Sequence, residues 1–208
     1  KMGGALNISD DGDHLILVSW VDNDVRIWDP VNKQRVWTKP GLALPVAAVR
    51  FAGQVVVAEH GRRSVIGYDK NGQEASIYAT DIESPTGLLV EGNDLFLTDR
   101  ASGRILQIAE AGEPMPAPRL VVSGLTTPEG LVKYNTAFAV VEADLGQVTV
   151  VGAQGSKRVV ATMAPASQAA SAEQPPSQIF NGIARDESGS LYVADETERV
   201  LYKISNAF

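Results

Sequence analysis

The sequence predicts an all-β protein of the β-propeller class, with five four-stranded blades in this chain and a sixth expected outside it. One observation is a unit of short strands that recurs about every 40 residues along the chain. Another is that apolar and polar residues alternate with a period of two inside these strands, which is typical of β-structure. Turns rich in Gly, Asp and Asn separate them. Four antiparallel strands per unit of this length is the pattern of a propeller blade.

The repeat is clearest in the second strand of each unit. These strands end at positions 40, 40, 43 and 53 residues apart, namely Ser19, Glu59, Asp99, Glu142 and Asp195. The strands that follow begin at regular offsets, at Val25, Val65, Ile105, Val148 and Val200. Each hairpin therefore keeps nearly the same length even where the whole unit stretches, so the unit is a structural module.

The first and fourth strands complete the module. First strands are expected at 5–9, 48–51, 88–91, 131–134 and 183–186, and fourth strands at 34–39, 74–79, 119–123 and 157–162. The fifth unit shows no fourth strand, and no spare strand precedes the first unit. We therefore expect an open ring, with a gap or a covered edge between the first and last blades, rather than a closed ring of five.

These strands define a single domain over residues 1–208. The blades are expected at about 1–41, 42–82, 83–125, 126–164 and 178–208. Residues 164–177, rich in Ala, Ser, Gln and Pro, form a surface insertion between the last two blades, either a flexible excursion or a lid. A β-sandwich is the alternative architecture, but it has no reason to repeat a four-strand motif.

The composition narrows the functional classes. The formal net charge is −7, and no basic stripe with interleaved aromatics occurs, which argues against a nucleic-acid partner. The chain has no cysteine, so disulfide and thiolate chemistry are excluded while the compartment stays open. Its apolar runs are far shorter than the roughly 20 residues of a membrane helix, so no membrane span is predicted.

The strand motifs resemble a known superfamily. The units start Pro85-Thr86-Gly87-Leu88 and Pro128-Glu129-Gly130-Leu131, and continue to strands such as Leu191-Tyr192-Val193-Ala194-Asp195. This pattern is similar to NHL repeats and to the senescence-marker/gluconolactonase and strictosidine-synthase-like propellers. Trp28-Asp29 looks like the end of a WD repeat, but no other unit ends this way. The resemblance implies a six-bladed ring and slightly favours a periplasmic or extracellular location.

The resemblance also points to the residue before each first-strand glycine. Glycine at the inner strand lets backbones approach closely at the propeller axis, so the residue before it lies at the mouth of the central tunnel. In gluconolactonase-like propellers such positions supply oxygen ligands to a divalent metal. Here Glu129 and Asn181 match two ligand types, and Thr86 is a further ligand-binding candidate at the tunnel mouth. A Ca²⁺ ion is the implied cofactor, but a third acidic ligand is missing.

The remaining acidic residues and the histidines are not predicted to form a catalytic or metal site. The acids that end the second strands recur at one module position, so we expect them to accept hydrogen bonds from the following hairpin or to pair with Arg63, Arg104 or Arg199. The histidines, His14 and His60, lie in separate units and form neither a metal site nor a triad.

Three functions remain open from the sequence. The first is a non-catalytic module that binds a protein partner or a small-molecule ligand at the tunnel-end surface, as NHL-type domains do. The second is a metal-dependent hydrolase of the lactonase type, which Glu129 and Asn181 suggest. The third is a strictosidine-synthase-like propeller without metal chemistry. An open ring would also invite association through its blade edges.

Overall fold

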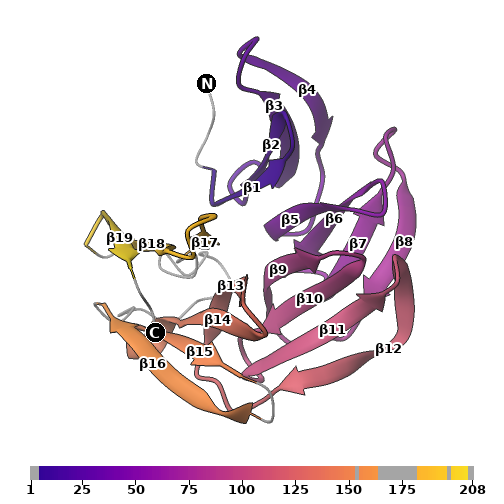
Figure 1. Cartoon of the computed structure of the whole chain (residues 1–208). Coiled ribbons are helices and arrows are strands. Elements are labelled where there is room, and N and C mark those ends of the chain that lie inside the picture. Colours follow the sequence, from indigo (N-terminus) through magenta and orange to yellow (C-terminus); the bar gives the residue numbers. More distant parts are fainter. Residues whose placement is uncertain (1–4, 153–154, 164–181, 196–197, 206–208) are drawn as a thin grey trace.

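The computed structural model describes residues 5–152, 155–163, 182–195 and 198–205. Over these residues the chain forms five antiparallel sheets arranged around a common centre (Figure 1). The propeller prediction is therefore confirmed. Asn181 and the predicted insertion at 164–177 lie outside the described residues.

The first three blades each contain four strands in sequence order. Blade 1 holds β1 (Asn7–Asp11), β2 (His14–Ser19), β3 (Asp24–Asp29) and β4 (Gln34–Lys39). Blade 2 holds β5 (Pro45–Phe51), β6 (Gln54–Glu59), β7 (Ser64–Tyr68) and β8 (Glu74–Ala79). Blade 3 holds β9 (Pro85–Glu91), β10 (Asp94–Asp99), β11 (Arg104–Glu110) and β12 (Glu113–Val122).

The last two blades differ in strand number. Blade 4 holds β13 (Pro128–Tyr134), β14 (Ala137–Glu142), β15 (Gln147–Val151) and β16 (Lys157–Thr162), with a short 3₁₀ turn η1 (Ala143–Leu145) after β14. Blade 5 holds β17 (Ile183–Arg185), β18 (Leu191–Asp195) and β19 (Val200–Ile204). Among the described residues, four blades therefore have four strands and the fifth has three. The missing fourth strand of blade 5 agrees with the strand count along the sequence.

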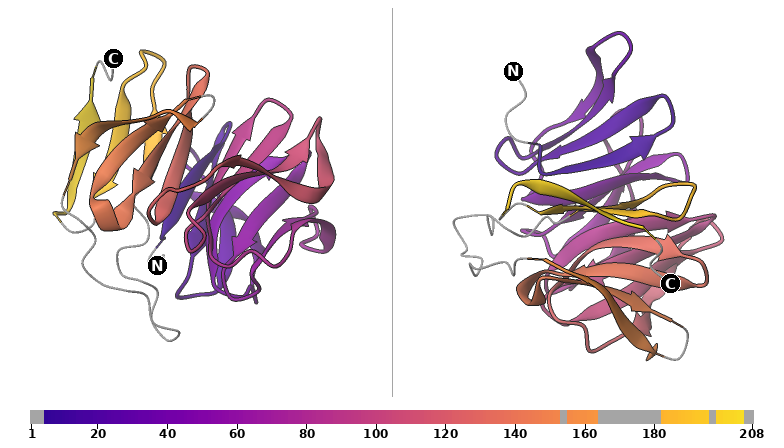
Figure 2. Two further views of the ribbon diagram at one scale, coloured as in Figure 1. Left: turned by 90° about the horizontal axis from the view of Figure 1, so that it is seen from below. Right: turned by 60° about the vertical axis from the view of Figure 1, so that its left-hand side comes forward.

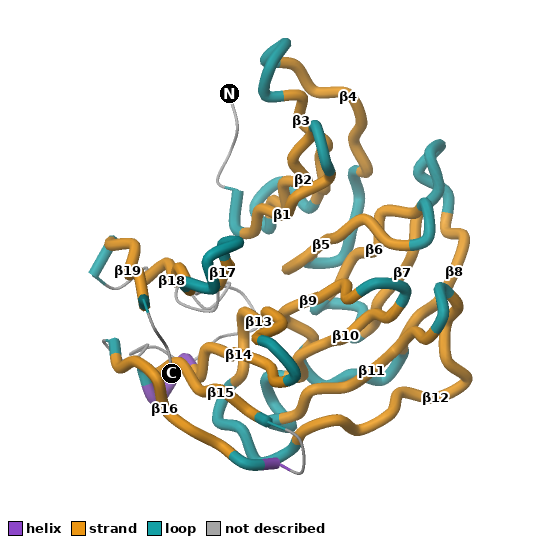
Figure 3. The backbone as a smooth tube through the Cα atoms, viewed as in Figure 1, coloured by secondary structure: helices purple, strands orange, loops and turns teal. Residues whose placement is uncertain are grey.

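Each blade runs outward from the centre. The strands β1, β5, β9, β13 and β17 lie innermost, and β4, β8, β12 and β16 lie on the outside (Figure 1). The tube in Figure 3 shows how short loops connect strands that run back and forth within each blade. A cavity of about 410 Å³ lies between the inner strands of all five blades. This cavity is the central tunnel expected from the sequence.

The blades lie side by side around the ring (Figure 2) and hold together through apolar side chains on their faces. One cluster joins Val18 and Val25 of blade 1 to Val57 and Ile66 of blade 2. Comparable clusters join blades 2 and 3, blades 3 and 4, and blades 4 and 5. Burial of such faces contributes about 25 cal/mol per Å² of apolar area, so the order of the blades around the ring follows from sequential stacking.

The ring is open between blades 5 and 1. The inner strands of successive blades contact one another from β1 through β5, β9 and β13 to β17, whereas β17 makes no comparable contact with β1 among the described residues. A cavity of about 420 Å³ separates the two blades, lined by Leu6, Ile8, Ile183, Tyr192 and Leu201 among others. The gap expected from the sequence is therefore present between the described parts of these blades.

Two apolar faces border this gap. Leu201 pairs with Ala194 in blade 5, as Val65 pairs with Ala58 in blade 2 and Val148 with Val141 in blade 4. Val65 and Val148 are fully buried, whereas Leu201 is 67% exposed. On the blade 1 side, Ile8 is 61% exposed although the equivalent Ala48 is fully buried. Both faces therefore carry the residues of a blade interface without a neighbouring blade.

Glycines at the inner strands do not all have the same role. A Cβ at Gly87 would overlap the carbonyl oxygen of Glu129 and would lie 2.8 Å from the Thr98 hydroxyl. Close backbone approach thus explains this glycine, as expected. A Cβ at Gly182 meets nothing within 4 Å. Crowding at the axis is therefore wrong as the explanation of Gly182, because Gly182 borders the open gap.

The described residues contain no helix long and apolar enough to cross a membrane.

Candidate functional site

The acids that end the second strands clamp the linkers that lead into their blades. The Glu59 carboxylate accepts the backbone N–H of Ala43 at 2.7 Å, and Asp99 accepts that of Ser84 at 2.9 Å. Glu142 accepts the N–H of Thr126 at 2.6 Å. A proline starts the inner strand of each of these blades. The two glutamates bond to the amide two residues before this proline, whereas the shorter aspartate bonds to the amide directly before it. The length of the acidic side chain therefore matches the position of the linker amide.

These acids are buried and have further partners. Glu59 accepts the Tyr68 hydroxyl at 2.5 Å, and burial followed by this hydrogen bond raises the pKa of Tyr68 above its usual value. Glu142 accepts the Thr149 hydroxyl at 2.5 Å. Asp195 accepts the N–H of Glu198 in the following hairpin at 3.0 Å. The predicted structural role is confirmed.

The partners of these acids are only partly those expected. Hairpin groups contribute, but linker amides and buried hydroxyls provide most contacts. No ion pair with the expected arginines occurs among the described residues, and the cation nearest to Glu59 is Arg62, at 3.9 Å. Contacts with the linker outnumber contacts with the arginines because each acid lies where the end of the second strand pairs with the start of the first strand. An example is the pairing of Asp99 with Pro85.

The residue that follows each acid forms a second contact with the same linker. The backbone N–H of His60 donates to the carbonyl of Leu44, that of Arg100 to Ser84, and that of Ala143 to Thr127. Each linker is therefore held at two points. The residues at this position, Trp20, His60, Arg100 and Ala143, lie at the end of the propeller where the inner strands begin, and we call them the rim residues.

Three rim residues form a polar and aromatic cluster. The rings of Trp20 and His60 lie 5.8 Å apart between centroids. His60 Nδ1 lies 3.5 Å from the Ser84 hydroxyl oxygen, at the outer limit of a hydrogen bond. Burial, and then the Arg100 cation, lower the pKa of His60 below its usual value. His60 is therefore neutral at neutral pH and presents a hydrogen-bonding ring beside a tryptophan.

Arg100 joins this cluster to the predicted site. Its Nε lies 3.4 Å from an oxygen of Glu129, and its Nη2 lies 3.1 Å from an oxygen of Asp144. Glu129 is 1% exposed, so its carboxylate lies below the surface next to the guanidinium. Glu129 thus lies at the start of an inner strand, as the sequence indicated, but it carries a cationic partner that the sequence did not reveal.

Thr86 connects two blades. Its hydroxyl lies 3.0 Å from the carbonyl of Pro128 and 3.0 Å from the hydroxyl of Thr98, which in turn donates to the carbonyl of Glu129 at 2.8 Å. Thr86 is buried. Its hydroxyl therefore ties blade 3 to the segment that positions Glu129.

Sequence reasoning had not joined Trp20, His60 and Arg100 into one site. The signal was present, because each residue directly follows the end of a second strand, at positions 19, 59 and 99. Three different side chains occupy this module position, so no shared residue type marks it. No group of three or more His, Cys, Asp or Glu side chains suited to a metal occurs in the part of the chain that the structure describes.

A pH effect follows from the environment of His60. In the unfolded chain a histidine takes up a proton near pH 6.5, whereas folded His60 does so only at lower pH. The unfolded state then binds more protons, so stability should fall as the pH drops below about 6.5. We expect the urea midpoint to fall less in His60→Gln than in the native protein over this range. The same fall in both proteins would contradict this assignment.

Comparisons with solved structures agree with this fold. A catalytically inactive histidine-to-alanine variant of virginiamycin B lyase from Staphylococcus aureus, determined with quinupristin, matches with a TM-score of 0.63 and 13% identity, over 96% of this chain and 69% of that chain. A streptogramin B lyase matches with a TM-score of 0.58 and 12% identity, over 97% of this chain and 82% of that one. A gluconolactonase from Xanthomonas campestris matches with a TM-score of 0.66 and 19% identity, over 88% and 66%.

No protein-family model and no curated protein matches the sequence. At these identities the structural matches show a shared fold, the β-propeller found in the lyases and in gluconolactonase. The resemblance to gluconolactonase-like propellers that the strand motifs indicate is therefore supported at the level of the fold.

Proposed function

We propose that this protein is a ligand-binding propeller whose binding surface is the tunnel end that carries Trp20, His60 and Arg100. The observation that carries the proposal is the convergence of these side chains, from three successive blades, beside the buried carboxylate of Glu129. The neutral imidazole of His60 and the guanidinium of Arg100 offer hydrogen bonds to one ligand, and Trp20, which is buried in the core, packs against the His60 ring. Thr86, one of the predicted ligand residues, lies near the start of β9 and so belongs to the same end of the propeller.

The test uses two probes, quinupristin, which is bound in one neighbouring structure, and gluconolactone, chosen because another neighbour is a gluconolactonase. Amide chemical shifts would be followed by NMR during titration with each compound. We expect changes at the amides of Trp20, His60, Arg100 and their linkers, and we expect Arg100→Ala to abolish them. Arg35→Ala serves as the control, because Arg35 is an exposed arginine of blade 1. We expect this variant to show the same chemical-shift changes as the native protein. Shifts confined to other surfaces, or none, would refute the proposed surface.

A second candidate function is a lactonase-type hydrolase, which the structural similarity to gluconolactonase favours. A lactonase of this type would bind a divalent metal at Glu129, and the described residues do not fit such a metal. Glu129 already lies beside the Arg100 cation, and a cation at this carboxylate would meet like charge within a few ångströms.

Calorimetric titration with Ca²⁺ separates the two candidates. We expect no binding heat at millimolar Ca²⁺ in the native protein, because the guanidinium of Arg100 occupies the place of a cation beside Glu129. Binding that disappears in Glu129→Gln, together with Ca²⁺-dependent opening of gluconolactone, would replace the ligand-binding proposal with the hydrolase.

The sixth blade expected from the sequence belongs with this proposal. We propose that one further blade packs between the exposed faces around Leu201 and Ile8 and completes the rim of the binding surface. The support is that equivalent positions in the other blades are fully buried by a neighbouring blade.

The expected effect of this blade is tested with Leu201→Lys in the complete protein. A lysine in a blade interface is poorly tolerated, so the melting temperature should fall by several degrees and the amides of β19 should lose protection from hydrogen exchange. The matched control is Val200→Lys, on the opposite face of the same strand and also exposed. Equal, small effects of the two changes would show that no blade covers Leu201.

A further inference from the structure

Blade 4 contains a pocket far from the rim residues, at the opposite end of the blade. The pocket has a volume of about 340 Å³ and lies between the turn that follows β13 and the hairpin that joins β15 to β16. This is the size of a site for a small organic molecule. The proposed function makes no use of it.

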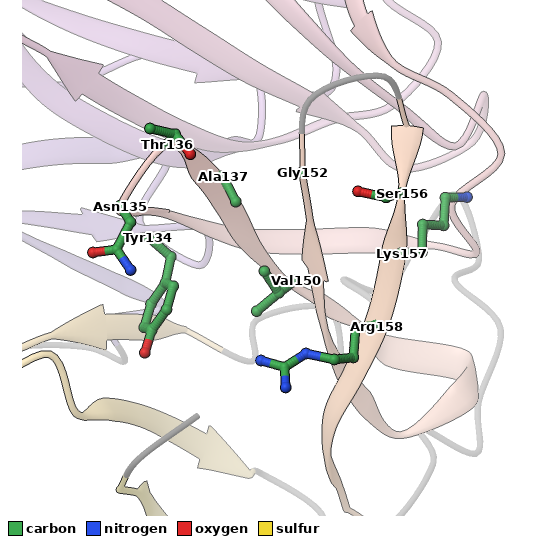
Figure 4. A pocket seen from close by; sticks show the side chains of 9 residues that line it. All are labelled: Tyr134, Asn135, Thr136, Ala137, Val150, Gly152, Ser156, Lys157 and Arg158. Atoms are coloured by element: carbon green, nitrogen blue, oxygen red, sulfur yellow. The ribbon is translucent and has the colours of Figure 1, made fainter. Parts of the chain in front are cut away.

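The side chains around the pocket have a consistent chemistry. Val150 and the ring of Tyr134 are its apolar parts, and Asn135, Ser156 and Arg158 are polar groups at its border (Figure 4). None of the lining residues carries a carboxylate. In Figure 4 the guanidinium of Arg158 extends over the pocket toward Tyr134. The lining therefore combines a flat apolar surface with hydrogen-bond donors and a positive charge.

At the position of Gly152, which lines the pocket, blade 4 lacks an acid that blades 1 and 2 have. The pairings Leu15–Trp28, Val55–Tyr68 and Phe138–Val151 are equivalent, so the residues that follow them occupy one module position. That position is Asp29 in blade 1 and Asp69 in blade 2, but Gly152 in blade 4.

The two aspartates serve their hairpins directly. Asp29 accepts the N–H groups of Val31 and Asn32, each at 2.9 Å. Asp69 accepts those of Asn71 and Gln73, each at 2.8 Å. Blade 4 has no side chain at Gly152 to provide this negative charge. The same hairpin is followed instead by two cationic residues, Lys157 and Arg158.

A further cation lies close by. The guanidinium carbon of Arg185, in the neighbouring blade 5, lies 5.5 Å from the centre of the Tyr134 ring. Lys157 contacts the carbonyl of Gly124 and so does not extend into the pocket. The local positive charge therefore comes from Arg158 at the pocket and Arg185 beside its aromatic wall, in a protein whose net charge is −7.

We propose that this pocket binds a small organic anion that carries its charge on a flat ring, as an aromatic carboxylate does. The carboxylate would take the place of the missing acid of the hairpin and would interact with Arg158. The ring would pack against Tyr134 and Val150. This site is independent of the ligand surface at the rim.

The test uses benzoate as the probe in an NMR titration of the protein. We expect shifts at residues 134–137 and 150–158. Gly152→Asp restores the acid of the other blades, and Gly152→Asn adds a side chain of the same size without charge. A Cβ at Gly152 lies 2.7 Å from the Ser156 hydroxyl, at the end of an exposed side chain that can rotate away, so both variants should fold.

The affinity of the two variants decides the proposal. We expect Gly152→Asp to bind benzoate about tenfold or more weakly than Gly152→Asn, since a like charge then lies in the pocket. Arg158→Gln should lose binding, while Arg119→Gln in blade 3 should not. Equal affinities of the two Gly152 variants, unchanged binding in Arg158→Gln, or no shifts around the pocket would each overturn the proposal.

Discussion

Replacement of Gly87 by Ala is expected to destabilise the protein strongly, and far more than the same change at Gly182. The new Cβ would overlap the carbonyl oxygen of Glu129, which is backbone and cannot rotate away. The Thr98 hydroxyl, 2.8 Å from the same Cβ, also holds the N–H of Gly87 at 2.6 Å. Overpacking of this kind commonly costs about 1–3 kcal/mol, and we expect a loss near the upper end of that range.

The matched control for this variant is Gly182→Ala. Gly182 precedes an inner strand in the same way, but its Cβ would meet nothing within 4 Å. Urea denaturation of the two variants should therefore give a large loss for the first and less than about 0.5 kcal/mol for the second. Similar losses in both would show that the contact between blades 3 and 4 at Gly87 is looser than described.

Replacement of Glu142 by Ala is expected to have a similarly large effect. The change removes the acceptor of the Thr126 N–H, the Thr149 hydroxyl and the Gln147 amide in one step. Thr149 is buried, so its hydroxyl is left without this partner away from water. Each unsatisfied buried group costs about 1–3 kcal/mol, and we expect a total loss of about 3 kcal/mol or more.

Glu83→Ala provides the comparison. Glu83 lies in the linker that enters blade 3 and is exposed, so its removal should change the free energy of unfolding by less than about 0.5 kcal/mol. Thermal and urea unfolding of both variants would check the difference. If Glu142→Ala were as stable as Glu83→Ala, the carboxylate clamp would not be what holds the linker.

The strands could be predicted because their signals are local. Alternating apolar residues between Gly and Asp turns placed the fourth strands of blades 1, 2 and 4 at the residues where the structure has them. The fourth strand of blade 3 is longer than expected, since β12 runs over Glu113–Val122 and contains Pro114 and Pro116. Proline is tolerated there because β12 is an outer edge strand, where a missing N–H breaks no ladder with a further neighbour.

The site could be predicted less well because its signals are not local. The burial of Glu129 and its contact with Arg100 depend on how blade 3 meets blade 4, and no pattern within either blade reveals that contact. The rim residues differ in type from blade to blade, so comparison of the repeats hides them. The acids next to them are repeated because each performs the same hydrogen bonding, and repetition made their structural role predictable.

The two-point clamp separates architecture from chemistry along the chain. At each clamp the acid bonds to the linker through its side chain, whereas the next residue bonds to the linker through its backbone N–H. The linker contact therefore sets no requirement on the side chain of that next residue, and histidine, arginine and alanine occur there in blades 2 to 4. Substitution at these positions of blades 2 to 4 gives a way to redesign what the surface recognises while the backbone hydrogen bonds to the linkers are kept, which makes this propeller a suitable framework for engineered binding proteins.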